Sequence, residues 1–245
     1  MKEAVVVLHK VGKTYANGVT ALTEIDFHLY PGEIVAVVGP SGCGKSTLLR
    51  LVAALEAPTS GTIAQGSASS AIGYVFQDST LLPWTTVEEN ITLPLKLNSA
   101  RGATLPVSEA LAMVGMTEFA KAYPRELSGG MKMRTAMARA LITNPKLLLL
   151  DEPFAAIDEI ARFQLDDCLL SLWQEQKFSA VFVTHSIFEA VYLARRIIVM
   201  SPRPGRLRGE VVIQTPYPRS PDFRETQEYL AYCNTVTQLL RCEAV

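Results

Sequence analysis

Residues 39–47 have the composition and spacing of a phosphate-binding loop. They read Gly-Pro-Ser-Gly-Cys-Gly-Lys-Ser-Thr and fit the pattern G-x-x-x-x-G-K-[ST]. The glycines let consecutive backbone N–H groups turn inward around an anion, and the positive N-terminal end of the following helix adds to the attraction. Lys45 is expected to reach the β- and γ-phosphates of a nucleoside triphosphate, and the Ser46 hydroxyl is expected to hold a magnesium ion. The residues predicted to surround the nucleotide are Gly39, Pro40, Ser41, Gly42, Cys43, Gly44, Lys45, Ser46 and Thr47.

The segments on either side of this loop supply the strand and the helix that such a site needs. The apolar run at residues 34–38 is typical of a buried strand, and residues 48–55 have a helical pattern. Cys43 lies inside the loop and has two interpretations. It is either a residue without chemistry or a thiol made reactive by the positive helix end.

An acidic pair follows a second apolar strand. Residues 147–150 are four leucines, which is typical of a strand in a parallel sheet, and Asp151 and Glu152 come next. In phosphate-loop enzymes an acid at this place completes the magnesium shell, usually through water, and Asp151 is assigned that role. Glu152 is a candidate general base that orients and polarises an attacking water.

Residues 127–131, Leu-Ser-Gly-Gly-Met, begin a predicted helix and could form a second anion site. Ser128 is a candidate N-cap, while Gly129 and Gly130 expose backbone N–H groups at the helix N-terminus. An isolated S-G-G is also compatible with an ordinary helix start. Between a phosphate loop and an acidic strand, however, it resembles the signature motif of the ABC ATPases.

The resemblance to the ABC ATPases extends over nearly the whole chain. Tyr15 matches the aromatic residue that stacks on adenine, Gln77 matches the Q-loop glutamine, and His185 matches the switch histidine. Residues 155–158, Ala-Ala-Ile-Asp, resemble the D-loop and place Asp158 at the dimer interface, with Ala155 where serine is common.

Membership of this family implies a homodimer with two composite ATP sites. Each ATP would lie between Lys45 of one protomer and the Ser128, Gly129 and Gly130 turn of the other. The implied catalytic residues are Glu152, His185 and Lys45. The implied magnesium set is Ser46, Gln77 and Asp151, so the expected cofactors are ATP and Mg²⁺.

Two further stretches resemble the ATPase subunits of nitrate/sulfonate/taurine-type importers. They are residues 81–90, Leu-Leu-Pro-Trp-Thr-Thr-Val-Glu-Glu-Asn, and residues 200–206, Met-Ser-Pro-Arg-Pro-Gly-Arg. This similarity implies coupling to a membrane permease and, indirectly, to a periplasmic or extracellular solute-binding protein, at the cytoplasmic face of the cell membrane. An exporter ATPase and a soluble non-transport ABC ATPase remain alternatives.

Leu82 and Trp84 are predicted to contact the permease. An apolar stretch with a proline and a large aromatic residue suits an interface anchor better than a solvent-facing loop. The alternative is that Trp84 packs in the core of the helical part.

The bulk composition is typical of a globular protein and does not indicate nucleic-acid binding. Hydrophobic residues make up 49% of the 245 residues, charged residues 19%, and the net charge is −1. A nucleic-acid binder would have a basic balance. No apolar run approaches the roughly 20 residues of a membrane span, and the first residues lack a signal-peptide core.

The elements that must position these residues alternate between strands and helices, which indicates an α/β fold with a parallel sheet. Residues 1–245 are predicted to form one domain with a phosphate-loop, RecA-like core at 1–78 and 144–215. An N-terminal antiparallel β part is expected around the Asn17-Gly18 turn. A helical subdomain is predicted at 79–143, interrupted by Pro94, Pro106 and Pro124. Short strands are predicted within 62–76, and residues 202–221, which hold five prolines, are predicted to be loop-rich. A C-terminal helical tail is predicted at 216–245, with its helix at 223–241.

Overall fold

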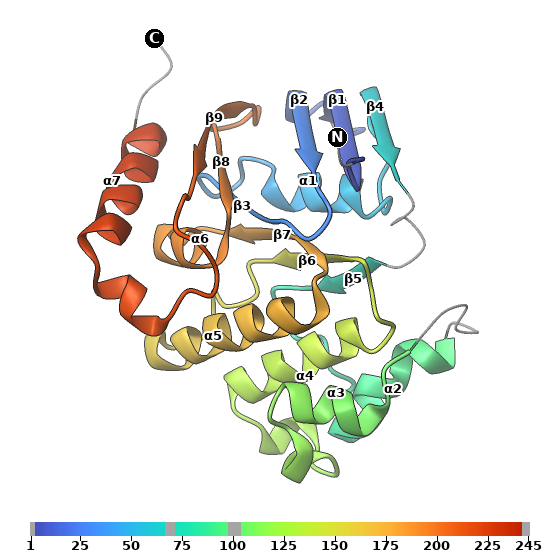
Figure 1. The fold of residues 1–245 in the computed structure, drawn as a ribbon. Coiled ribbons are helices and arrows are strands. Elements are labelled where there is room, and N and C mark those ends of the chain that lie inside the picture. The colour runs from blue at the N-terminus through green and yellow to red at the C-terminus, as the bar shows by residue number, and fades with distance from the viewer. Residues whose placement is uncertain (1–2, 67–71, 98–103, 242–245) are drawn as a thin grey trace. The chain divides into compact units, whose positions relative to one another are not determined.

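The computed structural model describes residues 3–66, 72–97 and 104–241 of the chain (Figure 1). The chain divides into two compact units. The first consists of Met1–Ser69 together with Ser179–Val245, and the second is Ser70–Phe178. The predicted subdomain boundary at residues 79–143 remains a prediction.

An antiparallel sheet of three strands forms part of the first unit, in the order β2-β1-β4 (Figure 1). The strands are β1 (Val6–Thr14), β2 (Thr20–Leu29) and β4 (Ser60–Gln65). Gly18 has a φ of 83° in the turn between β1 and β2, and the Tyr15 amide donates to the Val19 carbonyl at 2.9 Å. The predicted hairpin at Asn17-Gly18 is therefore confirmed, because a glycine supplies the left-handed backbone that the turn requires.

A parallel group of strands forms the centre of the first unit. Strand β3 (Ile34–Val38) is buried along its whole length and lies between β7 (Ser179–Thr184) and β8 (Arg196–Met200). The helices of this unit are α1 (Lys45–Val52), α6 (Ile187–Leu193) and α7 (Gln227–Arg241), with a short 3-10 turn, η4 (Pro221–Glu225), before α7. The helix predicted at 223–241 is confirmed in its end at Arg241, but it begins at Gln227, because residues up to Glu225 form the 3-10 turn.

Strand β9 (Leu207–Val212) pairs antiparallel with β8. Residues 202–221 were predicted to be loop-rich, and the six residues of β9 are a strand that this prediction did not place. The prolines at both ends concealed a short alternating segment in which Val211 and Ile213 are buried and Val212 is exposed.

The second unit combines a pair of parallel strands with helices. Strands β5 (Ile72–Val75) and β6 (Leu147–Asp151) pair in register from Ile72 with Leu147 to Val75 with Leu150. The α-helices are α2 (Val87–Leu97), α3 (Val107–Met113), α4 (Gly129–Leu141) and α5 (Glu159–Gln176), and α2 packs against α4 (Figure 1). Two 3-10 turns, η2 (Thr117–Phe119) and η3 (Pro124–Glu126), connect α3 to α4.

The proline positions only partly marked the helix ends. Pro106 precedes α3 and Pro124 starts η3, as predicted. Pro94 instead lies inside α2, so its prediction as a break was wrong. A proline removes one backbone donor, and the packing of α2 against α4 compensates for that loss. The strands predicted within 62–76 exist, but β4 and β5 pair with different partners, and most of the predicted turn between them lies outside the described residues.

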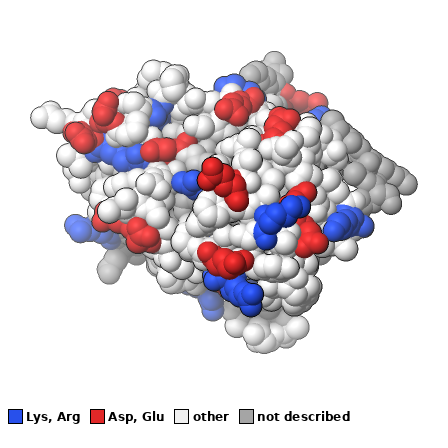
Figure 2. Space-filling model, turned by 90° about the horizontal axis from the view of Figure 1, so that it is seen from below, with Lys and Arg blue, Asp and Glu red and all other residues white. Residues whose placement is uncertain are grey.

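The α/β class, the parallel strands and the antiparallel N-terminal part are confirmed. On the face drawn in Figure 2, the described Lys and Arg side chains are interspersed with Asp and Glu, so neither sign of charge dominates there. Among the helices in the described part of the chain, none combines the length and apolar character that crossing a membrane requires.

Candidate nucleotide site

The phosphate loop leaves the carboxyl end of β3 and leads into α1. Gly42 and Gly44 adopt left-handed backbone conformations, with φ values of 74° and 105°. A Cβ on Gly44 would lie 2.7 Å from Leu22 Cδ2, and one on Gly39 would lie 2.9 Å from Cys43 Sγ. The motif therefore requires glycine at position 44 for its backbone conformation and for space, and at position 39 for space.

Lys45 is held inside this loop. Its side chain is buried, and Nζ donates to the carbonyl oxygens of Gly39 at 3.0 Å and Pro40 at 3.3 Å. The N-cap of α1 is Gly44, which has no side chain, and the first turn of α1 contains no acid. A positive group and the positive end of a helix therefore converge on the same loop, which fits the phosphates of a nucleotide.

Tyr15 lies beside the helix that follows the phosphate loop. Its hydroxyl is 3.1 Å from Thr47 Oγ1 and donates to Glu56 Oε1 at 3.4 Å, while Lys13 Nζ lies 5.3 Å from the ring centroid. The ring is half-buried. Adenine stacking on Tyr15 stays a prediction, but the contact with Thr47 brings the ring next to a residue of the loop motif.

His185 leaves the strand next to the one that carries the loop. Val38 of β3 is paired with Thr184 of β7, so Gly39 and His185 emerge side by side at the same sheet edge. His185 is exposed. Hydrogen bonds of the flanking residues fix the turn that contains His185. Thr184 Oγ1 donates to Glu189 Oε2 at 2.5 Å and accepts from the Ser186 amide at 2.9 Å.

Gln77, Asp151 and Glu152 follow two paired strand ends in the second unit. Val75 pairs with Leu150, and Gln77 and Glu152 each come two residues later. Asp151 is buried and accepts a hydrogen bond from the Tyr74 hydroxyl at 3.3 Å, while Gln77 is exposed. Glu152 has a φ of 46°, an uncommon conformation for a residue with a side chain. Such strain gathers at functional sites, which favours the assigned role of Glu152.

The signature turn and the D-loop lie against each other in the second unit. The Ser128 hydroxyl accepts from the Met131 amide at 3.3 Å and caps α4, while Ser128 and Gly129 are exposed. A Cβ on Gly129 would lie 3.2 Å from Ile157 Cδ1 of the D-loop. Asp158 caps α5 by accepting from the Ala161 amide at 3.0 Å. Ile160, two residues later, is 74% exposed, so an apolar side chain lies uncovered in the first turn of α5.

Trp84 is 72% exposed and Leu82 is half-buried. The alternative that Trp84 packs in a core is therefore wrong. The loop that presents Trp84 is built around Asn90, which is completely buried. Asn90 Oδ1 accepts from the Leu82 amide at 2.7 Å, and Nδ2 donates to Thr85 Oγ1 at 2.8 Å. Trp84 is thus an exposed residue on an ordered loop.

Sequence reasoning missed several residues that position the site. Arg139 of the signature helix donates to the Ser79 carbonyl at 2.7 Å and the Thr80 carbonyl at 2.9 Å, which ties α4 to the segment after Gln77. Burial lowers the pKa of Arg139. The bonds around His185 involve Ser186 and Glu189, whose S-x-x-E spacing was a readable helix-start signal. Arg139 and Asn90 carried no such signal, since their partners are distant or backbone atoms.

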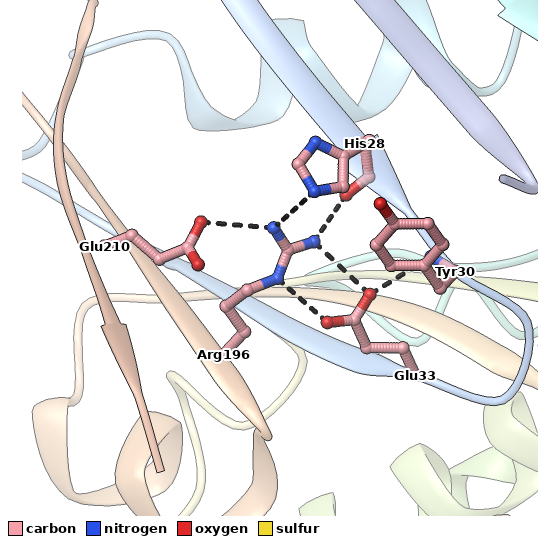
Figure 3. A network of polar contacts seen from close by, with 5 residues as sticks. All are labelled: His28, Tyr30, Glu33, Arg196 and Glu210. Atoms are coloured by element: carbon pink, nitrogen blue, oxygen red, sulfur yellow. Dashed lines mark hydrogen bonds and ion pairs between the residues drawn. The ribbon is translucent and has the colours of Figure 1, made fainter. Parts of the chain in front are cut away.

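A buried arginine, Arg196, forms a polar network near the amino end of β3, the end away from the phosphate loop (Figure 3). Arg196 Nε donates to Glu33 Oε1 at 2.8 Å, and Nη1 donates to Glu210 Oε2 at 3.1 Å. Nη1 lies 3.2 Å from His28 Nε2, and Nη2 also donates to the His28 carbonyl. The Tyr30 amide donates to Glu33 Oε2 at 3.1 Å. This network joins β2, β8 and β9 to Glu33, the residue directly before β3. It therefore anchors the start of the strand that leads to the phosphate loop.

Comparison with known proteins agrees with this site. Residues 22–155 match the family model of the ABC transporters. The aliphatic sulfonates import ATP-binding protein SsuB of Bacillus cereus is 44% identical over 86% of this chain and 85% of its own. The nitrate import ATP-binding protein NrtD of Synechocystis sp. is 42% identical over 94% and 91% of the two chains.

Solved structures show the same fold. The dimeric post-hydrolysis state of the ATP-binding cassette MJ0796 bound to ADP and Pi has a TM-score of 0.73 at 33% identity, and the match covers 86% of this chain and all of that one. A structure of cbiO1 from Clostridium perfringens has a TM-score of 0.76 over 96% of both chains, at 24% identity, and supports the fold alone. The chain belongs to the ABC transporter family and is an ATP-binding cassette ATPase.

Proposed function

We propose that this chain is the ATP-hydrolysing subunit of an ABC import system for a small solute of the nitrate, sulfonate or taurine class. The proposal is carried by two features of the same chain: a phosphate loop around a buried Lys45, and a turn at a helix start in which Ser128 and Gly129 are exposed. The import ATP-binding proteins SsuB and NrtD support the direction of transport and the solute class.

The active form in this proposal is a head-to-tail homodimer. Each ATP is bound by Tyr15 and the phosphate loop of one protomer and by the signature turn of the other. An isologous two-fold arrangement then gives two equivalent sites. The exposure of Gly129 and of Ile160 supports this arrangement, because Gly129 belongs to the signature turn and Ile160 follows Asp158 of the D-loop by two residues. The dimeric form of MJ0796 supports it as well.

Hydrolysis in this dimer depends on positioning and electrostatics. Ser46, Gln77 and Asp151 would hold Mg²⁺, which supplies charge neutralisation at the phosphates. Glu152 accepts a proton from the attacking water, whose oxygen bonds to the γ-phosphorus as the bond to the ADP oxygen breaks. Lys45 and the signature amides stabilise the negative charge that moves onto the phosphate oxygens. His185 contacts the γ-phosphate, and the hydrogen bonds of Thr184 and Ser186 hold the turn that presents it.

The membrane partner is a separate permease, and the ATPase acts at the cytoplasmic face of the membrane. Leu82 and Trp84 are the proposed contacts, because their loop follows Gln77 closely and presents an exposed aromatic residue. A periplasmic or extracellular solute-binding protein takes part indirectly, through the permease.

Reconstitution tests the proposal. The chain is co-expressed with a candidate permease from the same genome, purified, and inserted into liposomes with its ATPase side outward and the solute-binding protein enclosed in the lumen. ATP added outside should drive movement of labelled nitrate, taurine or an alkanesulfonate from the lumen to the ATPase side, which corresponds to import. A matched preparation with Lys45→Ala should not transport. Movement in the reverse direction would assign the chain to an exporter, and ATPase activity without any co-purifying permease would favour a non-transport ATPase.

A further inference from the structure

We propose that Arg203 is a positioning residue for the phosphate loop, acting through the backbone carbonyl of Gly42. Arg203 belongs to residues 200–206, which we term the brace. The inference rests on the proposed function of the phosphate loop and adds to it a residue from the other end of the first unit's sequence.

The brace lies directly against the phosphate loop. A Cβ on Gly39 would meet the Cβ of Met200 at 3.0 Å, and a Cβ on Gly205 would overlap the carbonyl oxygen of Cys43. Two glycines therefore permit the contact, one on each side. The loop has few side chains with which to pack, so its shape depends on the backbone that lies behind it.

Strand β2 holds the brace in place. The Gly205 amide donates to the Ala21 carbonyl at 2.9 Å, and the Thr23 amide donates to the Gly205 carbonyl at 3.0 Å. The brace is also closed on itself, because the Ser201 amide donates to the Arg206 carbonyl at 3.0 Å. These hydrogen bonds fix the brace, so it can support the phosphate loop that it contacts.

Arg203 extends from residues 200–206 to the phosphate loop. Its Nε donates to the Gly42 carbonyl oxygen at 3.2 Å. The amide of the same peptide unit belongs to Cys43 and donates to the Pro40 carbonyl at 3.2 Å. Both polar groups of this peptide are therefore held, one within the loop and one by Arg203. Gly42 has a left-handed backbone, which glycine adopts without steric strain, so the two hydrogen bonds fix this peptide.

The chemistry of arginine suits this role. A charged donor forms a stronger hydrogen bond to a carbonyl than a neutral one, and the planar guanidinium fixes its direction. Arg203 is exposed, so solvent screens its charge and the hydrogen bond carries the effect. Losing this directed hydrogen bond should weaken nucleotide binding about 5- to 10-fold.

The test compares Arg203→Ala with Arg206→Ala. Arg206 lies in the same brace, is also exposed, and pairs through Nη1 with Glu24 Oε2 at 2.8 Å. Both variants remove one positive charge, but only Arg203 contacts the loop. For Arg203→Ala we expect the Kd and KM for MgATP to rise about 5- to 10-fold while kcat stays within about twofold. Arg206→Ala should match the unmodified protein in all three.

Alkylation of the Cys43 thiol gives a second, direct measure of loop position. Cys43 is buried against Gly39, so a loosened loop should expose it. Peptide mass spectrometry should show faster Cys43 alkylation in Arg203→Ala than in Arg206→Ala. Arg203→Lys keeps a charged donor and should recover part of the ATP affinity, which a general loss of stability would not produce.

Equal ATP affinity in Arg203→Ala and the unmodified protein would overturn the inference, as would an equal loss in both arginine variants. If Arg203→Ala does not fold, Arg203→Lys serves as the test. In that variant, an ATP affinity, a rate of Cys43 alkylation and a salt dependence of ATP binding all equal to those of the unmodified protein would reject positioning through the directed bond. Lys45→Ala separates the two levels. Unchanged ATP binding in Lys45→Ala contradicts the proposed function itself, whereas loss there with no effect at Arg203 contradicts this inference alone.

Discussion

Replacing Trp84 by alanine should separate a docking residue from a core residue. Trp84 is 72% exposed, so only about a quarter of its surface is covered by the rest of the chain. A fully buried tryptophan covers up to ~250 Å², so about 60–70 Å² are lost on truncation. At ~25 cal/mol per Å² this amounts to about 1.5 kcal/mol of unfolding free energy.

The other tryptophan of the chain provides a matched control. Trp173 of α5 is 7% exposed, and Trp173→Ala should cost about 3–5 kcal/mol. For a chain of this size, each kcal/mol shifts the melting temperature by about 2–4 °C. A thermal melt should therefore show a drop of about 3–6 °C for Trp84→Ala and a larger drop, about 6–20 °C, for Trp173→Ala.

The binding assay completes this comparison. Trp84→Ala should bind MgATP normally and associate with the permease at least ~30-fold more weakly, as for the loss of an aromatic hot spot of about 2 kcal/mol. Surface plasmon resonance with the permease in nanodiscs measures this directly. A melting temperature as low as that of Trp173→Ala, or unchanged permease affinity, would refute the reasoning.

Three other variants test two contacts of the site and one buried hydrogen-bonding group at the end of α6. Glu152→Gln keeps the shape of the side chain but removes its basicity, so ATPase turnover should fall at least ~10²-fold while ATP still binds; near-normal turnover would exclude Glu152 as the base. Thr184→Val removes the bond to Glu189 below His185, so kcat should fall with little change in ATP affinity, and a change in affinity alone would argue against that role. Arg219→Ala leaves three carbonyls at the end of α6 without the donor that Nη1 supplies at 2.8–2.9 Å, and should cost about 3–5 kcal/mol in a denaturant titration; a loss below ~1 kcal/mol would contradict it.

The sequence predicted local chemistry better than it predicted supporting contacts. The Asn17-Gly18 hairpin and the loop at residues 39–47 were readable because each depends on glycines at fixed spacing. Strand β9 was missed, since an edge strand of six residues between prolines has almost the pattern of a loop. Pro94 was misread because helix packing, which the sequence does not display, compensates for the lost hydrogen bond.

The positioning residues were hidden for a different reason. Arg203 and Arg139 act on backbone carbonyls that lie 161 and 60 residues away in sequence. A carbonyl acceptor is present at every residue, so its partner leaves no trace in residue types. Only the folded chain shows which carbonyls these guanidinium groups reach.

Complementation between two inactive chains tests the central claim most directly, namely that each ATP site is shared by two protomers. Lys45→Ala damages the phosphate loop, and Ser128→Arg damages the signature turn, so each should be inactive alone. In a mixed dimer, a head-to-tail arrangement places both lesions in one site and leaves the other intact. Titrating one variant against the other should therefore restore part of the ATPase activity, with a maximum near equal amounts. If heterodimers form, as shown by differently tagged chains, and no mixture recovers activity, the shared site is contradicted.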